Sequence, residues 1–249
     1  MKIKLLPRPD NEHRTQEEAI ALHNQRKERM ISMPDIFQTV QENNAEAIES
    51  LRKDFKDHWL VTSTRIIYNQ NDLSARIIHN ADSTITKQKE IAVKEIPVCQ
   101  PTYLPKLLDN KSGLDYFRAL VDAPKATKEQ LLHFFIALSG KKEDDIRFWT
   151  PSQSSRRDDQ ARSVQLYFYD VGWFCVFGGG RVDDSDGLSR GVVVGSAKQT
   201  KFFSNKAIFD IEEKLITIPM QRKIRKDIER KLSSSRKVKI TWNLKVKIA

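Results

Sequence analysis

The sequence predicts an α+β fold, because stretches with helical periodicity and stretches with strand chemistry follow one another as separate blocks. Apolar residues recur at steps of three and four within residues 13–57 and 112–140. Residues 59–98 and 146–218 are instead rich in β-branched and aromatic residues, with turn residues between them. With 249 residues, of which 39% are hydrophobic, the chain can bury a core without disulfide cross-links.

Two helices are expected in the N-terminal segment. Thr15 and Glu18 form a capping box that opens a helix reaching to about Met30. Pro34 and Asp35 open a second helix. Its apolar stripe, interrupted once by a polar residue, consists of Phe37, Val40, Asn44, Ile48, Leu51 and Phe55.

This second helix has two interpretations. The stripe packs on its own domain, or residues 35–56 form a homo-oligomer seam in which Asn44 fixes the register. The second interpretation would make the protein a non-catalytic interaction module that uses this helix as its partner surface.

Residues 59–98 predict a small β-meander. The segments Ser63–Asn69 and Ser74–Asn80 are near-repeats, and the turn residues between them indicate a hairpin. A third strand is expected near Glu90–Val98.

Pro97, Pro101 and Pro105 favour a linker or domain boundary near residues 98–110. We therefore expect two domains, residues 1–98 and 99–249, with a single domain as the alternative.

A helical pair is expected in residues 112–140. The first helix stops before Pro124, and a second capping box, Thr127 with Gln130, opens the next one. Gly140 ends that helix. Its apolar stripe, which we assign to the core, consists of Leu131, Phe134, Phe135 and Leu138. His133 falls off the stripe and is expected in solvent.

The next block predicts an antiparallel sheet. Val164–Tyr169 and Trp173–Phe177 form a dense aromatic hairpin, and 191–195 is a short buried strand. A loop rich in Gly and Asp, residues 178–191, is expected between them. A further hairpin is expected over 207–218.

The C-terminus predicts a basic helix and a basic strand. The helix opens at Pro219, and Ser233 begins the serine run that ends it. Residues 237–248 then alternate strictly between apolar and polar side chains, so one face is buried and one is solvated and cationic. Trp242 lies on the apolar face and is expected in the core.

The net charge of +10 is confined to this end of the chain. Residues 1–197 hold 28 basic and 28 acidic residues, whereas 198–249 hold 15 and 5. A local cationic field indicates a polyanionic partner, most simply nucleic acid held through its phosphates. The expected nucleic-acid-binding residues are Arg222, Arg225, Lys226, Arg230, Lys237, Lys239, Lys245 and Lys247. The cationic strand face has no aromatic residue, so base stacking is not expected there.

Enzymatic chemistry has one weak signal, at residues 187–191. The sequence Gly187-Leu188-Ser189-Arg190-Gly191 matches a serine nucleophile elbow, but a valine strand follows it and no histidine lies beyond His133. A triad in a different chain order stays open, since geometry defines a triad. A hydrolase that uses loop 178–191 is therefore the third candidate function.

No cofactor or metal site is expected. Asp183, Asp184 and Asp186 are assigned to a solvated turn, because the positions that would complete a calcium loop are valines. No phosphate-binding or dinucleotide-binding glycine pattern is present.

Cys99 and Cys175 are expected to be free, buried thiols. They lie 76 residues apart in apolar segments, and the chain shows neither an export signal nor an apolar run long enough to span a bilayer. These observations predict a cytoplasmic protein with no membrane partner.

Overall fold

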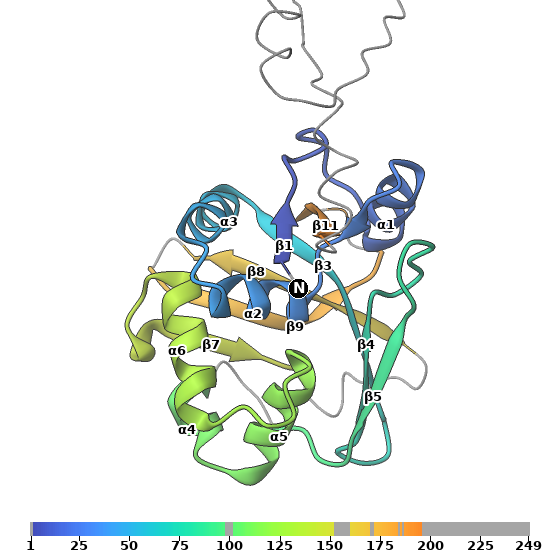
Figure 1. Ribbon diagram of the computed structural model, residues 1–249. Coiled ribbons are helices and arrows are strands. Elements are labelled where there is room, and N and C mark those ends of the chain that lie inside the picture. The colour runs from blue at the N-terminus through green and yellow to red at the C-terminus, as the bar shows by residue number, and fades with distance from the viewer. Residues whose placement is uncertain are drawn as a thin grey trace, which may run out of the picture. The chain divides into compact units, whose positions relative to one another are not determined.

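An eight-stranded mixed sheet forms the centre of the compact unit that ends at Gly195 (Figure 1). The computed structural model describes residues 2–97, 102–151, 160–169, 172–183, 185 and 187–195. Along the sheet the order is β5-β4-β3-β8-β9-β7-β6, and β10 pairs with β3. The strands are β3 (Trp59–Tyr68), β4 (Ala75–His79), β5 (Lys89–Val93), β6 (Thr102–Tyr103), β7 (Ile146–Trp149), β8 (Ala161–Phe168), β9 (Phe174–Arg181) and β10 (Gly187–Leu188).

A second, three-stranded sheet joins the two ends of the described chain. Strand β11 (Gly191–Gly195) lies between β1 (Lys2–Leu5) and β2 (Arg29–Met30), and both pairings are antiparallel. The short strand expected at residues 191–195 is thus confirmed, and Gly191 and Val192 in it are buried.

The helices agree with the expected α+β class. They are α1 (Gln16–Gln25), α2 (Met33–Gln41), α3 (Ala45–Asp57), α4 (Leu104–Leu108), α5 (Lys111–Leu120) and α6 (Lys128–Ser139), and a short 3-10 turn, η1 (Glu143–Asp145), precedes β7. Both expected capping boxes form, at Thr15 and at Thr127. Gly140 ends α6 in the left-handed conformation with φ of 67°, and His133 is exposed.

The predicted β-meander is confirmed. β3 and β4 pair antiparallel, with Ile66 opposite Ile77, so the two near-repeats face each other across the hairpin. β5 then pairs antiparallel with β4. The aromatic hairpin is confirmed as well, since β8 and β9 pair antiparallel.

The boundary expected near residues 98–110 is not found there. β3 pairs with β8 as well as with β4, so strands from both sides of that boundary share one sheet. The compact unit that contains them runs to Gly195, and a second unit comprises Ser196–Ala249.

Helix α1 packs on one face of this sheet, and helices α2, α3, α5 and α6 pack on the other. Leu60 belongs to the main core with residues of α2, α3, α5 and α6, whereas its neighbour Val61 belongs to a smaller cluster with Ala19 and Ile20 of α1. Successive side chains of a strand point to opposite faces, which places these two clusters on either side of β3. The main core is rich in edge-to-face aromatic pairs such as Phe117 with Phe148.

The expected continuous helix over residues 35–56 is wrong. The helix is interrupted after α2, where Asn43 adopts a φ of 51°. Asn44 is the N-cap of α3, and its side chain accepts a hydrogen bond from the backbone N–H of Ala47. Leu51 and Phe55 are fully buried in the main core, and Phe37 packs against it. Asn44 is therefore a cap and not a register-setting residue, and the stripe packs within its own unit.

Three further expectations need correction. The first helix ends at Gln25, because Arg29 and Met30 enter the small sheet. Residues 178–181 belong to β9 and not to a loop, and Leu104–Leu108 form a helix that the sequence analysis did not predict. The hairpin expected over 207–218 and the basic helix and strand lie outside the described residues.

Candidate functional site

The eight basic residues expected to bind nucleic acid cannot be placed. All lie between residues 222 and 247, outside the described residues, as does Trp242. The compact unit up to Gly195 holds the 28 basic and 28 acidic residues of the neutral part of the chain, and every residue of the +10 excess follows it. The charge boundary seen in the sequence therefore coincides with the boundary of the unit.

The structure brings Ser189 to a histidine that the sequence analysis did not connect with it. Nε2 of His23, near the end of α1, lies 3.0 Å from Oγ of Ser189. Nδ1 of the same ring lies 2.9 Å from Oε1 of Glu28. These three side chains have the connectivity of a serine, histidine and carboxylate triad, in the chain order His23, Glu28, Ser189.

The carboxylate fixes the tautomer of His23. An ionised carboxylate only accepts, so Nδ1 donates to Glu28 and the free lone pair of Nε2 accepts the Ser189 hydroxyl proton. Burial lowers the pKa of His23, and the hydrogen bond and charge of Glu28 oppose this effect. The imidazole is consequently neutral at pH 7, as a general base must be.

The triad is tightly enclosed. His23 has no exposed surface, and Ser189 and Glu28 are each 7% exposed. Glycine is required at position 191, because a Cβ there would lie 2.9 Å from the Glu28 carboxyl group and 3.2 Å from Nδ1 of His23. The arrangement therefore holds the three groups in fixed contact, but it offers a substrate little access to Ser189.

Arg190, the residue after Ser189, forms a second buried polar contact. Its Nε donates to Oδ2 of Asp54 at 2.6 Å, and the two side chains are 8% and 5% exposed. Its other nitrogens donate to the carbonyl of Leu6 and to Oγ of Ser50. Burial raises the pKa of Asp54, although the Arg190 charge opposes this.

A different surface, on the sheet face opposite the main core, is built from aromatic rings. We call it the aromatic face, and it consists of Trp59, Trp149, Tyr167, Tyr169 and Phe177. The register places its members on one side: Trp149 is opposite Phe177, and Gln165, two residues before Tyr167, is opposite Phe177. Their strand neighbours Leu60, Leu166 and Val176 point into the main core.

The rings of the aromatic face form a continuous row. Trp149 contacts Phe177 at 5.6 Å between centroids, and Phe177 contacts Trp59 at 5.7 Å. Trp59 then stacks on Tyr167 at 4.7 Å and meets Tyr169 edge-on. Trp149 and Tyr169, at the two ends of the row, are 38% and 37% exposed.

Polar groups and a thiol lie on the same side of the sheet. Arg147, opposite Cys175 in the register, places its guanidinium 4.5 Å from the ring of the exposed Trp173. Gln165 donates to Oγ of Ser163 at 3.0 Å, and Gly180 leaves room for it, since a Cβ there would lie 2.6 Å from the Gln165 amide nitrogen. Cys175 is free, as expected, and burial raises its pKa to about 12. Cys99 lies outside the described residues.

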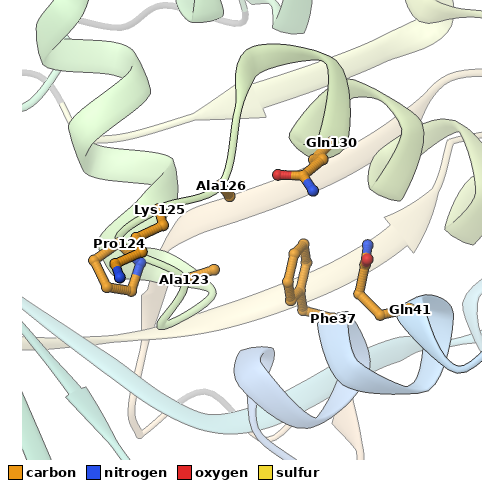
Figure 2. A pocket seen from close by; sticks show the side chains of 7 residues that line it. All are labelled: Phe37, Gln41, Ala123, Pro124, Lys125, Ala126 and Gln130. Atoms are coloured by element: carbon orange, nitrogen blue, oxygen red, sulfur yellow. The ribbon is translucent and has the colours of Figure 1, made fainter.

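A surface pocket lies elsewhere, between α2 and the start of α6 (Figure 2). Figure 2 shows Phe37 and Gln41 on one side and Gln130 on the other, with the α5–α6 connection closing the end. Its residues, which include no member of the Ser189 triad, are Phe37, Gln41, Ala123, Pro124, Lys125, Ala126 and Gln130. This lining has no serine, cysteine, histidine or carboxylate side chain beside Lys125, so we assign it no chemistry.

Of the three residues of the acidic turn, the structure describes Asp183, which is exposed. Asp183 pairs with Arg181 at 2.6 Å, and Asp184 and Asp186 lie outside the described residues. Within the described ranges no three His, Cys, Asp or Glu side chains are grouped as metal ligands. None of the described helices is long and apolar enough to cross a membrane.

Comparison with protein-family models, curated proteins and solved structures finds no match to this chain. The functional argument therefore depends on the residues themselves. Sequence reasoning had identified the Ser189 motif and the aromatic hairpin. It missed His23 and Glu28, since only the fold brings residues 166 positions apart into contact.

Proposed function

We propose that the protein binds nucleic acid, and that basic residues of the segment 196–249 supply the phosphate contacts. The observation that carries the proposal is the coincidence of two boundaries. The compact unit that ends at Gly195 has no net charge, and the sequence after it carries all of the +10.

This distribution has a direct physical consequence. A charge excess spread over a whole surface favours solubility, whereas one confined to 54 residues creates a strong local field that attracts polyanions. Phosphate contacts release condensed counterions, so the affinity falls as the salt concentration rises. The slope of log affinity against log salt changes by roughly 0.9 for each phosphate contact on duplex DNA.

The test removes three charges from one row of the expected basic helix. Arg222→Gln, Lys226→Gln and Arg230→Gln together should weaken binding to all sequences and flatten the salt slope by up to ~3 units. A matched control removes the same number of charges from exposed lysines of the neutral unit, with Lys53→Gln, Lys87→Gln and Lys94→Gln.

Fluorescence anisotropy of a labelled duplex at several salt concentrations measures both slopes. The control should shift the slope by less than about one unit. Equal slopes for the parent protein and the triple variant of the basic helix would reject that helix as a binding site. The same experiment on Lys237, Lys239, Lys245 and Lys247 then tests the remaining expected residues.

A second candidate function, ester or amide hydrolysis, is favoured by one observation. His23 contacts Ser189 through Nε2 and Glu28 through Nδ1, which is triad connectivity. In this reaction the Ser189 oxygen would attack a carbonyl carbon while its proton moves to Nε2 of His23. The proton then passes to the leaving group, and water cleaves the resulting acyl-serine ester.

A serine-directed fluorophosphonate probe tests this candidate without a known substrate. If Ser189 is a nucleophile, the probe labels it, and both Ser189→Ala and His23→Gln abolish the label. Ser185→Ala is the matched control, because Ser185 is an exposed serine of the same segment. Absence of labelling at Ser189 in the folded parent protein would assign the triad to structure alone.

A further inference from the structure

We propose that the aromatic face is a stacking surface for the bases of single-stranded nucleic acid. The inference rests on the proposed function, because it names the strand state and the chemical groups that the protein would recognise. It assigns base contacts to the described unit, a role that the basic residues themselves cannot fill, since phosphate contacts carry no base information.

The first argument is the composition and exposure of the face. Isolated surface hydrophobic residues are ordinary, but a contiguous apolar patch on a soluble unit marks an interaction site. Here five aromatic rings form one row over strands β3, β8, β9 and β7, and the rings at its ends, Trp149 and Tyr169, are more than one-third exposed. The face therefore presents flat π surfaces to solvent instead of branched aliphatic groups.

The second argument is the rigidity of these rings. Trp59 contacts Tyr167, Tyr169 and Phe177, so the centre of the row is fixed from three sides. Each strand is in turn held by its neighbours in the ladder, with Trp149 opposite Phe177. A platform fixed before binding loses little conformational entropy when a base stacks on it. Stacking accepts any base, because every base has a π face.

The third argument is the polar chemistry beside the rings. The guanidinium of Arg147 lies over the ring of Trp173 on the same side of the sheet; Arg147 itself is 7% exposed, so the exposed Trp173 ring is the group of this pair that is open to a base. The Gln165 amide lies opposite Phe177 in the register, is 8% exposed and donates to Ser163, so it fixes the sheet surface beside the rings and does not itself face a ligand. A sheet that carries exposed aromatics on adjacent strands is a general solution for single strands, whose unstacked bases are free to leave the helix.

The fourth argument concerns the occupant. An exposed aromatic surface would also suit a protein partner, but the sequence that follows the unit favours a polyanion. Gly195 follows Leu188 by seven residues, and Leu188 pairs with Leu60, the neighbour of Trp59. At 3.3–3.6 Å per residue, and with about 5 Å between paired strands, the chain therefore leaves the unit at most roughly 35 Å from Trp59. The next 54 residues carry +10, so the local field attracts the same ligand that the rings can stack.

The test replaces the two exposed end rings while keeping apolar bulk. Trp149→Leu with Tyr169→Leu removes the π surfaces, and Trp149→Phe with Tyr169→Phe keeps them. Ile85→Ala is the control for a general effect of surface hydrophobicity, because Ile85 is 46% exposed in the β4–β5 connection. Anisotropy is measured on the full chain with oligodeoxythymidine, oligouridine and a DNA duplex, so the arms also separate DNA from RNA.

The leucine variant should bind the preferred single strand at least about 25-fold more weakly than the parent, since each stacked ring contributes about 5-fold or more. Duplex affinity and the salt slope should be unchanged, and the phenylalanine and Ile85 variants should bind like the parent protein. The Arg222, Lys226 and Arg230 triple variant gives the opposite pattern, a flatter slope on all ligands, so the two proposals fail separately.

Three results would overturn the stacking proposal. The leucine variant could bind single strands as tightly as the parent, or it could lose duplex and single-strand binding equally. Alternatively, it could change the sedimentation mass of the free protein, which would assign the aromatic face to contacts between copies of the chain.

Discussion

Replacement of Arg190 by methionine tests the buried polar network that surrounds β11. The substitution keeps an unbranched apolar stem and removes the guanidinium, so it deletes the contacts to Asp54, Ser50 and the Leu6 carbonyl. Removing one partner of a buried ion pair costs about 3–5 kcal/mol, because a charge stays buried without compensation. Arg8 stays 3.5 Å from Asp54 and is 32% exposed, so we expect the lower end of that range, about 3 kcal/mol.

Urea unfolding and calorimetry measure this loss. For a unit of about 200 residues, 3 kcal/mol corresponds to a fall in Tm of about 6–12 °C. Arg76→Met is the control, because the Arg76–Glu90 pair is nearly half-exposed on both sides and should cost less than about 1 kcal/mol. Adding Asp54→Asn to Arg190→Met removes the stranded charge and should restore part of the stability.

The pH dependence gives the decisive result. Burial already raises the pKa of Asp54 above its ordinary value of 3.8, and loss of the Arg190 charge raises it further. A buried carboxyl group whose pKa is raised in the folded state lowers the free energy of unfolding as the pH rises from its ordinary pKa of 3.8 through the raised value. The cost of Arg190→Met should therefore increase with pH above 3.8, as measured by urea unfolding in steps from pH 4 to pH 8. A cost that stays constant over this range, or the same cost in an Asp54→Asn background, would refute the buried-charge argument.

Two more predictions concern single positions. Cys175 should resist iodoacetamide in the folded protein at pH 8 and react after denaturation, as read from its peptide by mass spectrometry, because its pKa of about 12 leaves almost no thiolate. Rapid native labelling would show that the thiol is accessible. Gly140→Ala should lower the free energy of unfolding by about 1–2 kcal/mol, since φ is 67° there and the new Cβ would lie 3.1 Å from the Arg52 guanidinium. A neutral result in urea unfolding would contradict the left-handed cap.

Local signals in the sequence were sufficient for much of the fold. Capping boxes at Thr15 and Thr127 depend on residues three apart, and the hairpin of β3 and β4 depends on two adjacent near-repeats. The same signals misled at Asn44, because an apolar stripe continues in phase across a break between two helices. The pair Asn43–Asn44 was the available clue, since asparagine tolerates a positive φ and caps helices.

Long-range pairing could not be read in this way. Periodicity assigned residues 59–98 and 146–218 to β structure, but the pairing of β3 with β8 depends on the whole fold. The same limit applies to the candidate sites. The aromatic hairpin was evident from its residues, whereas the addition of Trp59 and Trp149 to one exposed face required the strand order. The contact of Ser189 with His23 likewise required the position of α1.

The positions of Ser189 and Arg190 suggest what the buried polar groups accomplish in the described unit. These consecutive residues anchor to different parts of the first sixty residues, Ser189 to His23 of α1 and Arg190 to Asp54 of α3. The Arg190 carbonyl also accepts the backbone N–H of Ile31. Hydrophobic packing alone specifies the position of a short valine strand poorly, because its neighbours are nearly interchangeable and a shift by two residues keeps the same face inward. Directional contacts that match only one register remove this freedom, as buried polar residues do in other folds. Fixing the position of β11 is thus enough to explain why Ser189 contacts His23. The fluorophosphonate experiment measures whether Ser189 also acts as a nucleophile.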